Sequence, residues 1–168
     1  IRTQTLPEAP STRAWASLGV MMTVNNSLVC DPIHRFGTEP QKQRYLVPLA
    51  RGERLGCYAL TEPGAGSDAG AIKTRARKEK SGYTLNGNKI FITNGKQADI
   101  AIVYAVTSPD QGKHGISAFL VEKGTQGFVV GKLEDKMGLR SSDTAELIFQ
   151  DCHVPAENLL GVENEGFK

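Results

Sequence analysis

The sequence has little with which to build a disulfide framework or a metal centre. Its 168 residues include three cysteines, Cys30, Cys57 and Cys152, which are far apart and form no C-x-x-C pair. An odd number of scattered cysteines disfavours a disulfide scaffold and favours a reducing, intracellular compartment. The three histidines lack metal-ligand spacing with these cysteines, so we assign no metal.

An excess of charge and a long apolar run are also missing. The 20 basic and 18 acidic residues leave a net charge of +2, which gives no argument for a nucleic-acid or membrane-surface partner. The longest charge-free stretch, Ala14–Cys30, has 17 residues and contains Asn25 and Asn26, whereas a membrane span needs about 20 apolar residues. We expect a soluble protein without membrane insertion. No signal peptide is visible, but a chain that opens on Ile1 leaves its compartment open.

Glycine is scarce at the start of the chain and frequent afterwards. Three of the 18 glycines lie in the first 52 residues, and the other 15 lie in the remaining 116. Scarce glycine favours helices, whereas frequent glycine is typical of strands joined by tight turns. The fold class that follows is α+β, with a helical segment followed by an antiparallel barrel or sandwich.

The helical segment shows an apolar face and a start signal. Apolar residues at spacings of three and four predict one buried helix face: Ala14, Leu18, Met21 and Met22. Thr38–Gln41 has the pattern of a capping box with proline in the first turn. Pro48 is expected to kink or end that helix, and Gly52 to close the segment.

Runs of β-branched and aromatic residues predict the strands. They lie at 83–85, 89–93, 98–106, 116–122, 128–133 and 145–152. Asn86-Gly87 separates the first two runs and suits a type I′ turn, which predicts a hairpin there. The basic run Lys73–Lys80 has no aromatic partners, so a solvated strand face is favoured over a nucleic-acid site.

The glycine-rich segment Tyr58–Gly70 is the densest feature of the chain. Its Gly-x-Gly-x-x-Ala letters match the Rossmann pattern, but that motif needs a long helix directly after it. Alternating basic residues predict a strand there instead, and no Gly-Lys-Ser/Thr follows, so we reject both the Rossmann motif and the P-loop. The loop can still bind phosphate through backbone N–H groups and the hydroxyls of Thr61 and Ser67. A simple turn that joins the helices to the sheet is an equal alternative.

The second feature is Phe91–Gly95, which ends a predicted strand. Phe91 and Thr93 are two residues apart, so they are expected to share one face of the strand. An aromatic ring and a hydroxyl on one face suit a planar ligand. A core phenylalanine with a threonine at the strand end is the commoner alternative.

At these segments the sequence resembles the acyl-CoA dehydrogenases. Four motifs occur in the order of the family: Tyr58–Asp68, Phe91–Gly95, Lys136–Thr144 and Val154–Gly161. The resemblance covers almost the whole chain and is greatest for the short-chain, butyryl-CoA-type branch. It implies three parts: the end of an N-terminal helical domain (1–52), a middle antiparallel β-barrel domain (53–162) and the start of a linker to a C-terminal helical domain (163–168).

The resemblance implies that FAD and acyl-CoA bind this chain. The implied cofactor-binding residues are Tyr58, Ala59, Leu60, Thr61, Gly66, Ser67, Phe91, Ile92 and Thr93. Thr61 would bond near the N1/O2 edge of the flavin and Thr93 near N5 and O4. Ser67 would meet the FAD pyrophosphate and also the CoA side of the substrate. Phe91 takes the position of the family's usual tryptophan.

The resemblance also implies a reaction. A carboxylate base removes the α-proton of the acyl thioester while the β-hydrogen passes to the flavin as hydride, which gives a trans-2-enoyl-CoA. Electrons then leave to an electron-transferring flavoprotein. The base of the short-chain branch is a glutamate of the C-terminal domain, so we assign no catalytic residue in this chain. Glu62 belongs to the binding loop, and we expect Glu134, Asp135 and Glu146 on solvated faces.

Family resemblance further implies a homotetramer, located in the cytoplasm of a bacterium or the mitochondrial matrix of a eukaryote. Two alternatives stay open. The first is an acyl-CoA oxidase or flavin monooxygenase of the same superfamily. The second is a non-catalytic β-barrel binding module.

Overall fold

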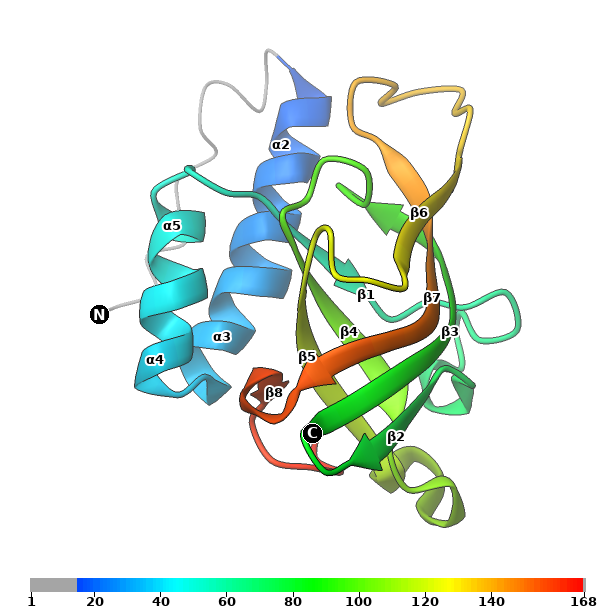
Figure 1. Cartoon of the computed structure of the whole chain (residues 1–168). Helices are drawn as coiled ribbons and strands as arrows, with labels where there is room; N and C mark the ends of the chain where they lie inside the picture. Colours follow the sequence, from blue (N-terminus) through cyan, green and yellow to red (C-terminus); the bar gives the residue numbers. More distant parts are fainter. Residues whose placement is uncertain (1–14, 168) are drawn as a thin grey trace.

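Two helical stretches open the computed structural model, which describes residues 15–167. The first consists of α2 (Ala16–Thr23), η1 (Val24–Cys30) and α3 (Asp31–Phe36), and the second of α4 (Glu39–Gln41), η2 (Lys42–Leu46) and α5 (Val47–Ala50). Figure 1 shows both stretches packed on one side of the sheet. Ala14, the earlier part of the predicted helical domain and Lys168 lie outside the described residues.

The second helical stretch starts as predicted. Thr38 is its N-cap, and the reciprocal bonds of a capping box join Thr38 and Gln41. Pro48 does not end the helix, which continues to Ala50. Proline has no N–H to donate within a helix, and the wider π-helical turn η2, with the Val47 N–H bonded to the Lys42 carbonyl, precedes it. Gly52 follows with a φ of 71°, the left-handed conformation that commonly closes a helix.

The predicted apolar face of α2 is only partly correct. The residues that α2 buries are the small Ser17 and Gly19, which suits a close approach to neighbouring chain. Met22 is 40% exposed, so the expectation that Met22 belongs to a helix core is wrong.

Each predicted strand run overlaps a strand, with the runs 83–85 and 89–93 joined in one, whereas the short strands at 56–59 and 159–160 are not predicted. The strands are β1 (Gly56–Ala59), β2 (Arg75–Glu79), β3 (Gly82–Thr93), β4 (Ile100–Val106), β5 (Ile116–Glu122), β6 (Phe128–Leu133), β7 (Thr144–Pro155) and β8 (Leu159–Leu160). Short 3₁₀ turns lie between them: η3 (Ala69–Ala71), η4 (Pro109–Gly115) and η5 (Ala156–Asn158). Along Lys73–Arg77 basic residues are exposed and alternate with buried ones, which confirms the predicted solvated strand face.

The sheet is mixed and open, so the predicted antiparallel barrel is wrong in two respects. Its order is β6-β7-β3-β2-β4-β5-β8, with β1 beside β4, and β1 and β4 run parallel. The cause lies just before both strands, where Leu55 bonds to Asp99 through its amide and its carbonyl. Because β1 and β4 start from this one point, they run in the same direction. The end strands β6 and β8 do not close the described sheet.

Two apolar clusters use the two faces of the sheet. One is enclosed by the curled strands, and the other lies between the sheet and the helices. Residues of β4 alternate between them: Ile100, Ile102 and Tyr104 face the helices, and Ala101, Val103 and Ala105 face the inner cluster. A strand buried on both faces explains the continuous apolar run in the sequence.

Asn86-Gly87 does not make the predicted hairpin turn. Both residues lie inside the continuous strand β3, and the hairpin turn falls earlier, where Glu79 of β2 pairs with Gly82. At Asn86 the register with β7 shifts, and the Asn86 side chain bonds to both the amide and the carboxylate of Asp151. Gln150 and Asp151 of β7 together oppose Asn86, so the β-bulge lies in β7 and the dipeptide stays within β3 opposite it.

Two buried asparagines join the helices to the sheet at Gly56. The Gly56 N–H donates to the side-chain oxygen of Asn25 (2.9 Å), and the Gly56 carbonyl accepts from the side chain of Asn94 (3.1 Å). Asn94 also donates to the Met21 carbonyl. A Cβ on Gly56 would lie 2.6 Å from a methyl group of Val29, so glycine is required where β1 crosses η1.

Asn25→Ala should lower the free energy of unfolding by about 2 kcal/mol, because it leaves the buried Gly56 N–H without an acceptor. Urea denaturation measures this loss. The control is Ser27→Ala, two residues along the same helix and exposed, without a side-chain hydrogen bond to any other described residue, which should change stability by less than about 0.5 kcal/mol. Equal losses in the two variants would contradict the assigned junction.

Candidate functional site

The segment Tyr58–Thr61 lies beside the part of β3 that carries the second motif. The Ile90 N–H donates to the Thr61 carbonyl (2.9 Å), and the Lys89 ammonium donates to the Leu60 carbonyl (2.9 Å). The two segments singled out in the sequence, 31 residues apart at Leu60 and Phe91, are therefore neighbours in the fold.

Lys89 and Glu62 form a buried ion pair at this junction. The Nζ–Oε1 distance is 2.7 Å, and the side chains are 0% and 6% exposed. The Glu62 carboxylate also accepts from the backbone N–H groups of Lys73 (2.6 Å) and Thr74 (2.9 Å). The pair thus joins β1, β3 and the far end of the glycine-rich loop.

The two partners affect each other's titration. Burial favours the neutral acid of Glu62, but hydrogen bonds from Lys89, Thr74 and Lys73 outweigh it and hold the pKa below its ordinary 4.5. Burial lowers the pKa of Lys89 to about 8, against the attraction of Glu62. At neutral pH the carboxylate and the ammonium are both charged.

The glycine-rich loop is open. A Cβ on Gly64 or Gly66 would meet nothing within 4 Å, and Gly66 and Ser67 are exposed. Their backbone N–H groups donate to no other residue within the described 15–167. The three-residue turn η3 and then β2 follow the loop, which confirms the rejection of the Rossmann motif. The arrangement suits an anion that approaches the backbone closely.

A β-bulge sets the position of Phe91. Lys89 pairs with Leu147 and Ile92 with Ala145, so Ile90 and Phe91 together face the single residue between them on β7. Phe91 has a φ of 56° and is 60% exposed. The core-phenylalanine alternative is wrong, and the simple two-residue alternation does not apply here. Bulges of this kind occur next to functional sites, where they redirect a side chain.

The other predicted site residues differ in exposure. Ala59 and Ile92 are buried in the inner cluster, so only their backbone groups are available to a ligand. Tyr58 packs on the helix side, its ring 5.0 Å from that of Tyr104. Thr61 and Thr93 are partly exposed.

Three predicted hydroxyl groups are free to bind a ligand. Those of Thr61, Ser67 and Thr93 make no hydrogen bond to any other described residue. The contacts bring together Thr61 and the segment that contains Thr93. Ser67 lies on the loop that leaves from Glu62, and no hydrogen bond among residues 15–167 joins it to β3.

Sequence reasoning missed the residues that support the site. The sequence places Lys89 in a predicted strand and Asn94 in the Phe91–Gly95 motif, and it assigns a role to neither. A fully buried lysine has no signature in a single sequence, because its partner Glu62 lies 27 residues away. Glu62, which the sequence analysis assigns to the binding loop and not to catalysis, is buried.

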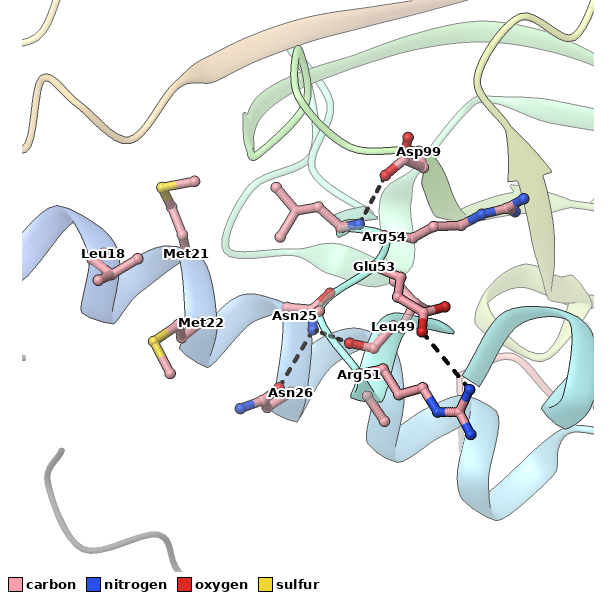
Figure 2. A pocket seen from close by; sticks show the side chains of 13 residues that line it. Leu18, Met21, Met22, Asn25, Asn26, Leu49, Arg51, Glu53, Arg54 and Asp99 are labelled. Carbon is pink, nitrogen blue, oxygen red and sulfur yellow. Dashed lines mark hydrogen bonds and ion pairs between the residues drawn. The ribbon is translucent and has the colours of Figure 1, made fainter. Parts of the chain in front are cut away.

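A hollow elsewhere in the chain is separate from these segments. Figure 2 shows it, with a volume of about 580 Å³, between α2, η1 and the segment 49–55. Met21 and Met22 border it on the helix, and Arg54 and Asp99 on the sheet side. None of the predicted cofactor-binding residues lines it.

Comparison with known families decides the relationship of the chain. Residues 57–152 match the family described as acyl-CoA dehydrogenase, middle domain, and residues 9–53 match acyl-CoA dehydrogenase, N-terminal domain. The chain belongs to the acyl-CoA dehydrogenase family. The four ordered motifs therefore identified the family correctly.

Individual relatives agree with this assignment. An acyl-CoA dehydrogenase of Bacillus subtilis is 56% identical over 92% of this chain and 41% of its own length. The solved structure of butyryl-CoA dehydrogenase from Megasphaera elsdenii is 55% identical, with a TM-score of 0.89 over 91% of this chain and 40% of that one. A structure of PigA with FAD and proline is 39% identical, with a TM-score of 0.89 over 90% of this chain and 40% of that one. The chain thus spans about two fifths of the length of the curated relatives that it matches.

No cluster of three or more histidine, cysteine or acidic side chains in residues 15–167 is placed to hold a metal ion. No helix there is long and apolar enough to cross a membrane.

The Glu62 carboxyl should make the stability of the fold decrease as the pH falls. A carboxyl whose pKa is lowered by folding stabilises the fold above its unfolded pKa of about 4.5, and this contribution is lost as the pH falls through the folded value. Glu62→Gln should therefore lose less stability than the wild type between pH 5 and about pH 3, relative to its own value at pH 5. Urea midpoints across this range test it, with the exposed Glu39→Gln as the control that keeps the wild-type slope. A wild-type slope in Glu62→Gln would contradict the assignment.

Proposed function

We propose that the chain is the cofactor-holding part of an FAD-dependent acyl-CoA dehydrogenase that oxidises a short-chain acyl-CoA to a trans-2-enoyl-CoA. The observation that carries the proposal is the juxtaposition of Tyr58–Thr61 with Phe91-Ile92-Thr93 by Lys89, with free hydroxyls on both segments. The identity to butyryl-CoA dehydrogenase supports the short-chain substrate.

The residues present fit FAD. A flavin needs a flat surface, donors at its polar edges and an anion site for its pyrophosphate. The exposed ring of Phe91, the hydroxyls of Thr61 and Thr93, and the open backbone at Gly66-Ser67 offer these three features. The FAD-containing structure of PigA, with the same fold over 90% of this chain, supports this cofactor. When bound, FAD supplies the acceptor for the hydride and the two electrons.

The proposed tasks of the individual residues follow from their chemistry. Thr61 and Thr93 donate hydrogen bonds to the polar edges of the ring, where negative charge develops on reduction, so preplaced donors favour the reduced state. Phe91 packs against one ring face. Ser67 and the Gly66 amide hold the pyrophosphate, and Ser67 also contacts the CoA portion of the substrate.

No carboxylate of this chain is proposed as the base that removes the α-proton. A general base works best with a pKa near the operating pH, whereas the pKa of Glu62 is held low by Lys89 and by backbone donors. Asp135 is exposed and pairs with Arg140 at 2.9 Å. We propose that the base is a glutamate of a C-terminal helical domain.

The proposed context of the chain comes from the family. Residues 1–52 are the end of a helical domain, 53–162 a middle β-domain and 163–168 the start of a linker. The complete protein is proposed to be a soluble homotetramer that passes electrons to an electron-transferring flavoprotein, in the bacterial cytoplasm or the mitochondrial matrix.

Phe91→Ala should weaken FAD binding without unfolding the protein. The side chain is 60% exposed, so the free energy of unfolding should change by less than about 0.5 kcal/mol. Loss of a stacking ring should raise the Kd for FAD about tenfold. Flavin titration followed by fluorescence measures the Kd, and Phe91→Trp is the control that retains a stacking surface. An unchanged Kd in Phe91→Ala would remove Phe91 from the site.

The longest natural polypeptide that contains this chain should purify yellow. Addition of butyryl-CoA without oxygen should bleach the visible flavin absorbance by about the full oxidised amplitude, as reduction of the ring requires. The 168-residue chain alone should give no turnover. Rapid peroxide formation in air would favour the oxidase or monooxygenase alternative, and a colourless full-length protein that rejects both FAD and acyl-CoA would favour the binding module.

A further inference from the structure

We infer that Lys89 and Glu62 are positioning residues for the flavin, an assignment that rests on the proposed function. Neither side chain is available to touch the cofactor, because both are buried. Their effect is exerted through three backbone groups that they hold: the Leu60 carbonyl and the N–H groups of Lys73 and Thr74.

The contacts of Lys89 fix the segment that would lie along the ring. Its ammonium binds the Leu60 carbonyl, one residue before Thr61, while the neighbouring Ile90 N–H binds the Thr61 carbonyl. Lys89 itself is four residues before Thr93 on the same strand. The contacts of Lys89 therefore fix the distance between the two segments that carry the proposed flavin donors, Thr61 and Thr93.

The contacts of Glu62 hold the two ends of the glycine-rich loop together. Glu62 precedes the glycines of the loop, and the two N–H groups that its carboxylate accepts from lie 11 and 12 residues further along the chain. Inside the loop Glu62 and Ala65 exchange two backbone bonds at 3.0 and 3.1 Å. Gly66 and Ser67 make no such bonds within the described residues. The bonds that join the two ends of the loop therefore restrict the directions in which their N–H groups point.

Stability alone does not account for this pair. Among the ion pairs of the described residues, it is the one in which both side chains are less than one tenth exposed. Replacing a buried ion pair with apolar side chains of similar size is often neutral or stabilising. An apolar pair, however, cannot hold a carbonyl and two N–H groups in fixed positions. The ion pair therefore fixes the positions of backbone groups that apolar side chains could not hold.

The decisive variant is the apolar double substitution Lys89→Met/Glu62→Met, made in the full-length protein. We expect it to fold, with a Tm below that of the wild type, because the Leu60 carbonyl and the N–H groups of Lys73 and Thr74 lose their partners. Its Kd for FAD should rise about tenfold or more, the effect of losing hydrogen bonds to charged groups. Its flavin should also show a changed visible spectrum and a changed midpoint potential, because the donors at the ring edges have moved. The isosteric Glu62→Gln should shift the same three readouts by a smaller amount.

The control is Lys42→Met/Glu39→Met, which removes a 2.9 Å ion pair on the helix surface and should leave FAD affinity, spectrum and potential unchanged. A folded Lys89→Met/Glu62→Met variant with wild-type affinity, spectrum and potential would overturn the inference. Failure of both Glu62→Gln and the double variant to fold would assign the pair to stability and would overturn it as well. A wild-type protein that binds no FAD would instead defeat the proposed function itself.

Discussion

One buried ion pair organises the candidate site. Lys89 and Glu62 are opposite charges 2.7 Å apart with almost no exposure to water, and each is also bonded to backbone groups. A buried charge is tolerated only when its partner and its remaining hydrogen bonds are in place. The need to pair these two buried charges holds together β1, β3 and the end of the glycine-rich loop, which are distant in the sequence.

The sheet around the pair is irregular at the candidate site. The bulge at Ile90-Phe91 turns an aromatic side chain out of the strand, and the open glycines leave backbone accessible. The helices are tied to the same region through Gly56, which begins β1 only two residues before Tyr58. The candidate site therefore adjoins strand β1, which is held at both ends: Asn25 and Asn94 bond to Gly56 at its start, and Lys89 bonds to Leu60 just after its end.

Regular features were predictable because they repeat. The strands at 116–122 and 128–133 and the capping box at Thr38 appear where the sequence places them. The family was predictable from four ordered motifs, and the exclusion of the Rossmann motif followed from the absence of a long helix after the glycines. Irregular features were not predictable. Asn86-Gly87 lies opposite a bulge of β7 and makes no turn, and Phe91 leaves the alternation of its strand, because strand register is decided by the partner β7.

By itself, the sequence determined the division into helices and strands, the absence of a Rossmann helix after the glycine-rich loop and the membership of the acyl-CoA dehydrogenase family. These properties depend on residue type and local spacing. The tertiary structure alone decided that the sheet is open and mixed, that a lysine in an ordinary strand is fully buried, and that two motifs distant in the chain lie side by side. Those outcomes depend on which residues meet across the fold. The charge of Lys89 can be buried only because the fold places the carboxylate of Glu62 beside it.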